Sequence, residues 1–393
     1  MTVAGIICEF NPLHRGHAYL MAQLRQQGAE AIVCAMSGNF VQRGEPALVN
    51  KLSRAEMAVD CGADLVLELP TPWAMATAER FARGGVQLLA MAGCRRIGFG
   101  SECGDAAVLQ AVGEALLSPA VQEGIRAELA AGITYAAARQ RAVQAQLGDA
   151  AAVLRQPNDT LAVEYLKACR WLGGGMTPVA VRRVGAAHDG GAAEGYAAAS
   201  HIRQLLRQGG EGEALSYLPE AAAAVLAREL AAGRIADGRN VERAVLARLR
   251  QMTETEFAAY DGGGEGLYHR VYDAVRGSAT MEALLAAAKT KRYTAARLRR
   301  MVLAAWLGMA EMPETVPYAR VLAANETGRA ILRQMRKAGV PVLTKAADVA
   351  ALGTAAETLF RREAGYTDLY TLEYADLGQS APGSDWRMTP VMR

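Results

Sequence analysis

The sequence predicts an α/β fold, a doubly wound parallel sheet followed by a mainly α-helical C-terminal region. Short apolar runs alternate with stretches of helical periodicity through about the first 100 residues. Helical stretches of that length are typical of the crossovers between parallel strands. After about Gly210, short helical patterns separated by glycines replace this alternation. We therefore expect a sheet domain at residues 1–210 and a mainly helical domain, with a small terminal α/β unit, at residues 211–393.

Five strands are expected in the first half of the chain. Each candidate is a short apolar run, as is typical of a parallel sheet with both faces buried. Asn11-Pro12 and Pro70 end two of these runs, because proline has a fixed φ and cannot donate a ladder hydrogen bond. The expected strands are residues 3–10, 31–36, 64–69, 95–99 and 177–184.

Helices are expected where apolar residues recur at helical spacing. Ser53-Arg54-Ala55-Glu56 is a capping box that predicts a helix ending at Gly62, and Ser200 is placed to cap the last helix of the sheet domain. The other expected helices are residues 16–27, 74–91, 106–147 (several helices), 160–171, 219–232 and 241–252. The terminal strand-helix-strand unit is expected at residues 320–324, 327–337 and 340–344.

His14 and His17 lie at the turn between the first strand and the first helix. Free backbone N–H groups and the positive end of the helix dipole favour an anion at such a turn. Histidines one helical turn apart can reach the same phosphate, and Gly16 lets the backbone approach it. The turn therefore predicts attack on the α-phosphate of a nucleotide, with both imidazoles stabilising the transition state. The alternative is a pair of ordinary polar turn residues.

Other polar segments also follow predicted strands. Residues 37–45 and 98–102 are polar or glycine-containing loops, and Ser200 and Arg203 open a helix after the fifth strand. Ligands in doubly wound sheets bind beyond the carboxyl ends of the strands. We expect these segments and the histidine turn to line one cleft, with Ser200 and Arg203 as further phosphate contacts.

A basic stretch in the second half of the chain contains no acidic residue. Phosphates of RNA suit its lysines and arginines, and its tyrosine suits stacking on an unpaired base. A solvated, charged helix face is the alternative. The candidate RNA contacts are Lys289, Lys291, Arg292, Tyr293, Arg297, Arg299 and Arg300.

Composition excludes several classes of protein. Apolar residues make up 51% and charged residues 21% of the chain, which is typical of a globular protein. The six cysteines form no C-x-x-C pair, so neither a zinc site nor a disulfide framework is predicted, and no metal ligands are assigned. No run approaches the roughly 18 apolar residues of a membrane span, and the first residues lead directly into a strand. We expect a cytoplasmic protein.

These motifs resemble those of the bacterial tRNA(Met) cytidine acetate ligase family, within the nucleotidyltransferase superfamily of the H-x-G-H signature. The resemblance implies a HUP/Rossmann-like, ATP-binding catalytic domain followed by a tRNA-binding domain. It extends over nearly the whole chain, and the stretch from Met36 to Pro46 is much more specific than H-x-G-H alone. The matching segments are residues 9–17, 36–46, 64–70, 156–158, 291–294 and 320–322.

The resemblance implies that ATP and acetate form acetyl-adenylate, whose acetyl group passes to N4 of the wobble cytidine of elongator tRNA(Met). Mg²⁺ is expected with the nucleotide. His14, His17 and Lys51 are the implied catalytic set, with Lys51 as a phosphate contact. The implied ATP contacts are Ile7, Cys8, Glu9, Phe10, Asn11, Pro12, Leu13, His14, Arg15, Gly16, His17, Ala18, Tyr19, Leu20, Gly100, Asn158 and Arg183.

The sequence departs from the family pattern at two places. Ala198 replaces a hydroxyl residue ahead of Ser200, and Asn50 precedes Lys51 where relatives usually have an Asp-Lys pair.

Two other functions stay open. One is a small-molecule nucleotidyltransferase, against which the long second half argues. The other is a non-catalytic nucleotide- and RNA-binding protein, against which His14, His17, Gly16 and Asn11 together argue.

Overall fold

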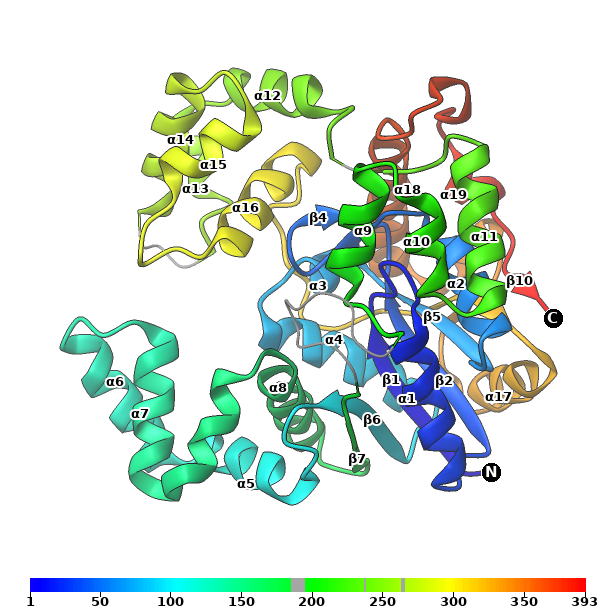
Figure 1. Cartoon of the computed structure of the whole chain (residues 1–393), viewed down its shortest axis with the longest axis horizontal. Coiled ribbons are helices and arrows are strands. Elements are labelled where there is room, and N and C mark those ends of the chain that lie inside the picture. The colour runs from blue at the N-terminus through cyan, green and yellow to red at the C-terminus, as the bar shows by residue number, and fades with distance from the viewer. Residues whose placement is uncertain (185–194, 237, 263–265) are drawn as a thin grey trace.

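The computed structural model describes residues 1–184, 195–236, 238–262 and 266–393. An eight-stranded sheet lies at its centre, with the strand order β10-β8-β5-β2-β1-β6-β7 and with β9 beside β8 (Figure 1). Helices cover both faces of this sheet. The predicted α/β fold with a doubly wound, mainly parallel sheet is confirmed.

β1, β2, β5, β6 and β7 run parallel, and all of them except the edge strand β7 are largely buried. Ile6 of β1 pairs with Cys34 of β2 on one side and with Gly98 of β6 on the other. Because both faces are covered, these strands are continuous apolar runs rather than alternating ones. Their bounds are β1 Val3–Cys8, β2 Ala31–Ser37, β5 Leu65–Leu69, β6 Arg96–Ser101 and β7 Thr177–Arg182.

The strands of the terminal segment complete this same sheet. β8 (Ala319–Ala324) pairs antiparallel with β5, and β9 (Val342–Leu343) and β10 (Val391–Met392) lie parallel to β8. Every residue of β8 is buried. The predicted terminal strand-helix-strand unit is present as β8, α17 (Glu326–Lys337) and β9, and its strands belong to the main sheet, because an apolar run that is buried on both faces needs a place inside a larger sheet. The division near residue 210 stays a prediction.

Alternate residues of the strands face two different layers of helices. Ile6 and Cys34 pack against α1 (Arg15–Gln26) and α2 (Lys51–Asp60), together with α9 to α11. On the other face, Val33 and Ile97 lie in the core cluster of α4 (Ala78–Met91) and α8 (Pro157–Trp171), with α5 to α7, α17 and α18. The bounds are α5 Ala106–Leu117, α6 Pro119–Ala130, α7 Tyr135–Leu147, α9 Ala199–Arg207, α10 Glu211–Ser216, α11 Glu220–Ala231, α17 Glu326–Lys337 and α18 Thr354–Thr371.

A helical region from α12 to α16 has a core of its own, and Phe40 joins that core to the sheet domain. Phe40 belongs to the hairpin of β3 (Phe40–Val41) and β4 (Glu45–Pro46). Its ring centroid lies 6.3 Å from that of Trp306 in α16 and 6.0 Å from that of Tyr370 in α18. The bounds are α12 Glu242–Gln251, α13 Glu254–Ala258, α14 Leu267–Gly277, α15 Met281–Ala288 and α16 Ala295–Leu307.

Two helix starts differ from the predicted ones. Asn50 rather than Ser53 caps α2, because the Asn50 side chain accepts from the Ser53 backbone N–H at 3.0 Å. The segment after Pro70 first forms the short α3 (Thr71–Ala74) before α4 begins. The remaining short elements are α19 (Ser384–Arg387) and 3₁₀ helices at Gly148–Arg155, Ala346–Leu352 and Leu377–Gln379. None of the described helices combines the length and apolarity that crossing a membrane requires.

We predict that Gly328→Ala destabilises the protein. A Cβ at this residue of α17 would clash with the Asp64 backbone oxygen, which cannot move without shifting the start of β5. The expected loss in the free energy of unfolding is about 1–3 kcal/mol, as for other overpacked sites. The measurement is chemical denaturation of both proteins.

Gly365→Ala in α18 is the matched control. No heavy atom lies within 4 Å of a Cβ built there, so helix propensity alone should stabilise the variant by up to about 1 kcal/mol. Equal effects of the two substitutions would contradict the close approach of α17 to β5.

Candidate active site

A cleft of about 460 Å³ lies beyond the carboxyl ends of β1, β6 and β7. Its wall includes most of the predicted ATP contacts, together with Ser200 and Arg203. Pro12, Leu13, Arg15 and Ala18 do not line it, although their neighbours do. The predicted residues in the wall are Ile7, Cys8, Glu9, Phe10, Asn11, His14, Gly16, His17, Tyr19, Leu20, Gly100, Asn158, Arg183, Ser200 and Arg203.

The two histidines form a stacked pair at the N-terminus of α1. His14 is the N-cap residue, and its Nδ1 accepts from the Gly16 backbone N–H at 3.1 Å. The Nδ1 of His17 accepts in turn from the His14 backbone N–H at 3.3 Å, and the ring centroids lie 3.8 Å apart. Because each Nδ1 is an acceptor, each neutral ring carries its proton on Nε2. The pair therefore offers two Nε2–H donors.

Burial and a nearby cation keep both imidazoles neutral. Desolvation, followed by the positive charge of Arg183, lowers the pKa of His14 to about 3. Desolvation, the neighbouring His14 and Arg183 also lower the pKa of His17 well below its usual range. A bound anion would favour the protonated rings. The site thus combines the permanent positive charge of Arg183 with two imidazole donors that are neutral without a ligand and can take up a proton beside an anion.

One side of the cleft is built where β6, β7 and α8 meet. The Glu102 carboxylate accepts from the Asn158 side chain at 2.6 Å and from the Asp159 backbone N–H at 2.9 Å. Asp159 in turn accepts from the Glu102 backbone N–H at 2.9 Å. Arg183 donates its backbone N–H to Ser101 at 3.0 Å. This reciprocal bonding brings Gly100, Asn158 and Arg183 to one wall, as expected.

On the opposite side of the cleft, Arg203 connects the elements that form the wall. This side chain donates to the Asn11 backbone oxygen at 2.8 Å and lies 3.4 Å from a carboxylate oxygen of Glu45. Arg203 thus joins α9 to the histidine turn. The expected Ser200 cap is wrong, because Ala198 is the N-cap residue of α9 and Ser200 lies in its first turn. Ser200 nonetheless lies in the wall of the cleft.

Residues of the segment 37–45 line the cleft as expected, but the sequence did not predict that this segment contains the β3–β4 hairpin or which of its side chains face the cleft. Val41, Gln42, Arg43 and Glu45 line the cleft, and the Gln42 backbone N–H donates to Glu9 Oε1 at 2.8 Å. Burial raises the pKa of Glu9. The signal was the unusual length of the polar loop after β2, which does not reveal which of its residues point inward.

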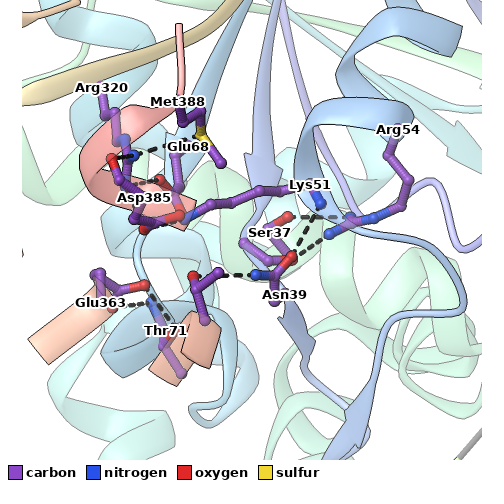
Figure 2. Close-up of polar contacts among 12 residues, drawn as sticks. Ser37, Asn39, Lys51, Arg54, Glu68, Thr71, Arg320, Glu363, Asp385 and Met388 are labelled. Atoms are coloured by element: carbon purple, nitrogen blue, oxygen red, sulfur yellow. Dashed lines mark hydrogen bonds and ion pairs between the residues drawn. The ribbon is translucent and has the colours of Figure 1, made fainter. Parts of the chain in front are cut away.

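The structure does not bring Lys51 to the cleft. Its ammonium lies 2.7 Å from Glu68 and 2.8 Å from Asp385, and Arg320 lies 2.7 Å from the same Asp385 oxygen (Figure 2). The side chains of all four residues are at most 6% exposed. Despite burial, Lys51 and Arg320 lower the pKa of Asp385. The position of Lys51 is therefore that of a structural cation, and the expected phosphate contact is not supported.

The basic stretch is divided between solvent and the protein interior. Lys289, Lys291 and Arg292 are exposed, but the Tyr293 ring is buried in the core of the helical region. The predicted stacking of Tyr293 on a base is therefore wrong for this conformation, because its apolar ring completes that core. Arg297 lies over the Tyr293 ring, 5.2 Å from its centroid.

Arg299 and Arg300 bind the hairpin that borders the cleft. Arg300 donates to the Gln42 backbone oxygen at 3.1 Å, and Arg299 donates to the Arg43 backbone oxygen at 3.0 Å. Burial, with Arg297 and Arg299 nearby, lowers the pKa of Arg300 to about 10. Gly44 permits the contact, since a Cβ there would lie 2.5 Å from the Arg300 backbone nitrogen. Helix α16 thus holds the rim of the cleft.

The fold and the histidine turn define the class of the protein. The family model for HIGH Nucleotidyl Transferase matches residues 1–383. A crystal structure of Thermotoga maritima TmcAL in its apo form superposes with a TM-score of 0.94 at 29% identity, covering 100% of this chain and 99% of that chain. The same enzyme solved with alpha-thio ATP superposes with a TM-score of 0.93.

Curated relatives give the particular family. The tRNA(Met) cytidine acetate ligase of Caldanaerobacter subterraneus subsp. tengcongensis is 34% identical over 396 residues, 97% of each chain. That of Syntrophotalea carbinolica is 39% identical over 350 residues, 86% of this chain and 83% of the relative. The chain belongs to the tRNA(Met) cytidine acetate ligase family.

We predict that His14 makes stability depend on pH. The unfolded chain binds a proton at His14 below about pH 6.5, whereas the folded chain binds it only below about 3. Between these values the free energy of unfolding should rise with pH, by up to about 1.4 kcal/mol per pH unit for this group.

His14→Asn keeps an N-cap acceptor and removes the titration. Denaturation at a series of pH values should give a smaller slope for the variant than for the wild type. Equal slopes would mean that the folded protein protonates His14 as readily as the unfolded chain does.

We predict that Lys51→Met destabilises the protein by about 3–5 kcal/mol, because Glu68 and Asp385 would remain buried with one cation between them. Denaturant titration measures the loss. The exposed Lys337→Met is the control and should change stability by no more than about 0.5 kcal/mol. Normal stability of Lys51→Met with weakened ATP binding would instead restore the phosphate-contact hypothesis.

Proposed function

We propose that this chain is an ATP-dependent ligase that activates acetate as acetyl-adenylate and acetylates N4 of the wobble cytidine of elongator tRNA(Met). The relatives above carry the name of this activity over nearly their whole length. The single observation of the structure that supports it best is the stacked, neutral pair His14 and His17 at a helix N-terminus in the cleft. That arrangement suits a triphosphate.

In the first step, an acetate oxygen attacks the α-phosphorus of ATP. The bond from the α-phosphorus to the bridging oxygen breaks, and pyrophosphate leaves with that electron pair. The Nε2–H groups of His14 and His17 and the N-terminus of α1 stabilise the charge that develops on the phosphates. Arg183 adds a permanent positive charge on the opposite wall.

In the second step, the N4 amine of cytidine attacks the acetyl carbonyl carbon of the adenylate. The bond from this carbon to the phosphate oxygen breaks, AMP leaves, and the amine loses one proton. The AMP phosphate or water can accept that proton, so no side chain is required as a general base. Adenylation is needed because acetate itself is a poor acyl donor.

Mg²⁺ supplies charge neutralisation to a bound triphosphate and usually needs few protein ligands. No group of three or more His, Cys, Asp or Glu side chains in the described residues could hold a metal ion. The cleft carboxylates Glu9 and Glu45 are engaged by Gln42 and by Arg203. The residues present fit an ion that arrives with the nucleotide, and we assign them no ligand role.

The test is mass spectrometry of nucleosides from unmodified elongator tRNA(Met), incubated with the protein, ATP and isotope-labelled acetate. Labelled N4-acetylcytidine is expected. His17→Ala should reduce its formation on the order of a hundredfold or more, as when a preorganised donor is removed elsewhere. Both proteins should have the same circular dichroism spectrum.

The same incubation separates the two alternatives. Pyrophosphate release without modified tRNA would favour a nucleotidyltransferase with a small-molecule acceptor. Binding of tRNA with neither product would favour a non-catalytic RNA-binding protein. Either result with folded protein would contradict the proposed ligase.

We propose that the exposed part of the basic stretch, Lys289, Lys291 and Arg292, contacts tRNA, whereas Arg299 and Arg300 act on the cleft. Arg300→Ala should slow ATP/pyrophosphate exchange on the order of tenfold without tRNA, because the Gln42 backbone loses one of its anchors.

Arg292→Glu is the matched variant from the same stretch. It should weaken tRNA binding and reduce the salt dependence of that binding, but leave the exchange rate unchanged. Normal exchange in Arg300→Ala would contradict its role in holding the rim of the cleft.

A further inference from the structure

A second groove, away from the cleft, lies between α17 and the terminal segment. Its volume is about 530 Å³. Arg329, Arg333 and Arg336 of α17 line one side, and Lys345 and Thr389 complete the polar wall. None of the residues that line this groove is acidic. It is therefore a concave surface with a concentrated positive charge.

The charges of this groove are not neutralised within the described residues. Among the described residues, the side chains of Arg329, Arg333 and Lys345 have no hydrogen-bond or ion-pair partner, and the Arg336 side chain donates only to the hydroxyl of Thr344, at 3.4 Å. All four cationic residues are exposed. Arg299 and Arg300, which the sequence placed among the RNA contacts, instead bind the hairpin. The α17 groove thus adds exposed cations to the exposed part of the basic stretch as a surface for a polyanion.

The arrangement of α17 explains why these side chains share one surface. Arg329, Arg333 and Arg336 follow at intervals of four and three residues, so they lie on one face of the helix. The opposite face is apolar, with Ile331 and Met335 in the core against the sheet. From Arg329 to Arg336 the helix rises by about 10 Å. Successive phosphates of a nucleic-acid strand are about 3.4 Å apart along its axis, so this face can contact more than one phosphate.

We propose that this α17 groove binds the phosphate backbone of the tRNA substrate. Guanidinium groups bind phosphates in pairs of parallel hydrogen bonds, and the Thr344 and Thr389 hydroxyls can donate to the same oxygens. Contacts to phosphates fix the position of an RNA without reading its sequence. The groove therefore contributes affinity and orientation, and the adenylation cleft acts on the base.

This inference rests on the proposed function for the identity of the RNA, but its test measures binding directly. The variant is Arg329→Glu/Arg333→Glu, and the matched control is Lys337→Glu/Arg126→Glu. Both change the net charge by the same amount, and the control residues are exposed but do not line the groove. Equilibrium binding of unmodified elongator tRNA(Met) is titrated at several salt concentrations, with thermal unfolding as the check on folding.

We expect the groove variant to bind tRNA at least about tenfold more weakly and to lower the slope of log affinity against log salt by about 2. The control should keep most of the affinity, and both variants should exchange ATP and pyrophosphate at the wild-type rate. In the acetylation assay the groove variant should have a higher KM for tRNA and an unchanged kcat.

Equal tRNA affinity in the groove variant and the control would overturn the proposal. Binding to anionic lipid vesicles is measured in parallel. A groove variant that loses binding to the vesicles but keeps its tRNA affinity would also overturn the proposal, because the groove would then suit a membrane surface. A wild-type protein that makes no N4-acetylcytidine would contradict the proposed function alone, since the binding titration still tests the groove.

Discussion

The buried guanidinium of Arg54 holds together the carboxyl ends of the strands on which the cleft is built. Arg54 is 0% exposed and donates to the backbone oxygens of Val49, Glu9 and Ser37, at 3.0, 2.6 and 3.0 Å, and also to that of Gly38. The carbonyl groups of Glu9, Ser37 and Gly38 lie where the chain leaves β1 and β2, so strand pairing does not satisfy them, and that of Val49 lies just before α2. Backbone groups buried without partners would be costly. One side chain thus fixes both the histidine turn and the start of the hairpin.

Charges in the wall of the cleft are also partly paired with one another. Glu45 lies between Arg203 and Arg299, at 3.4 and 3.6 Å, so much of the positive charge in the wall is already balanced. Neutral histidines then supply donors without adding fixed charge. A site of this kind can bind a triphosphate and still release pyrophosphate, which a cluster of permanent cations would hold more strongly.

The sequence predicted the parts of the site that depend on local structure. It failed for residues whose surroundings are formed by segments far away in the chain. The apolar runs and the histidine turn are local patterns, so the strands and the class of the site followed from them. Lys51 is different, because its partner Asp385 lies 334 residues away and nothing near Lys51 indicates a buried anion. Tyr293 and Arg300 likewise look like solvent-exposed residues in sequence, and only the packing of α16 against the hairpin shows otherwise. The edge of the sheet joined by β8 was not predictable for the same reason.

The antiparallel pairing of β8 with β5 means that the nucleotide-binding sheet is assembled from segments far apart in the chain. During synthesis, β5 emerges long before β8, and until β8 pairs with it β5 presents an unpaired edge that is apolar except for Glu68. Contacts of such long sequence separation form slowly. A fragment ending near residue 210 would keep this edge open permanently, with Glu68 deprived of Arg320. The adenylating half of the molecule is therefore not a module that can be separated from its C-terminal part, and its nascent form is a natural client for chaperones.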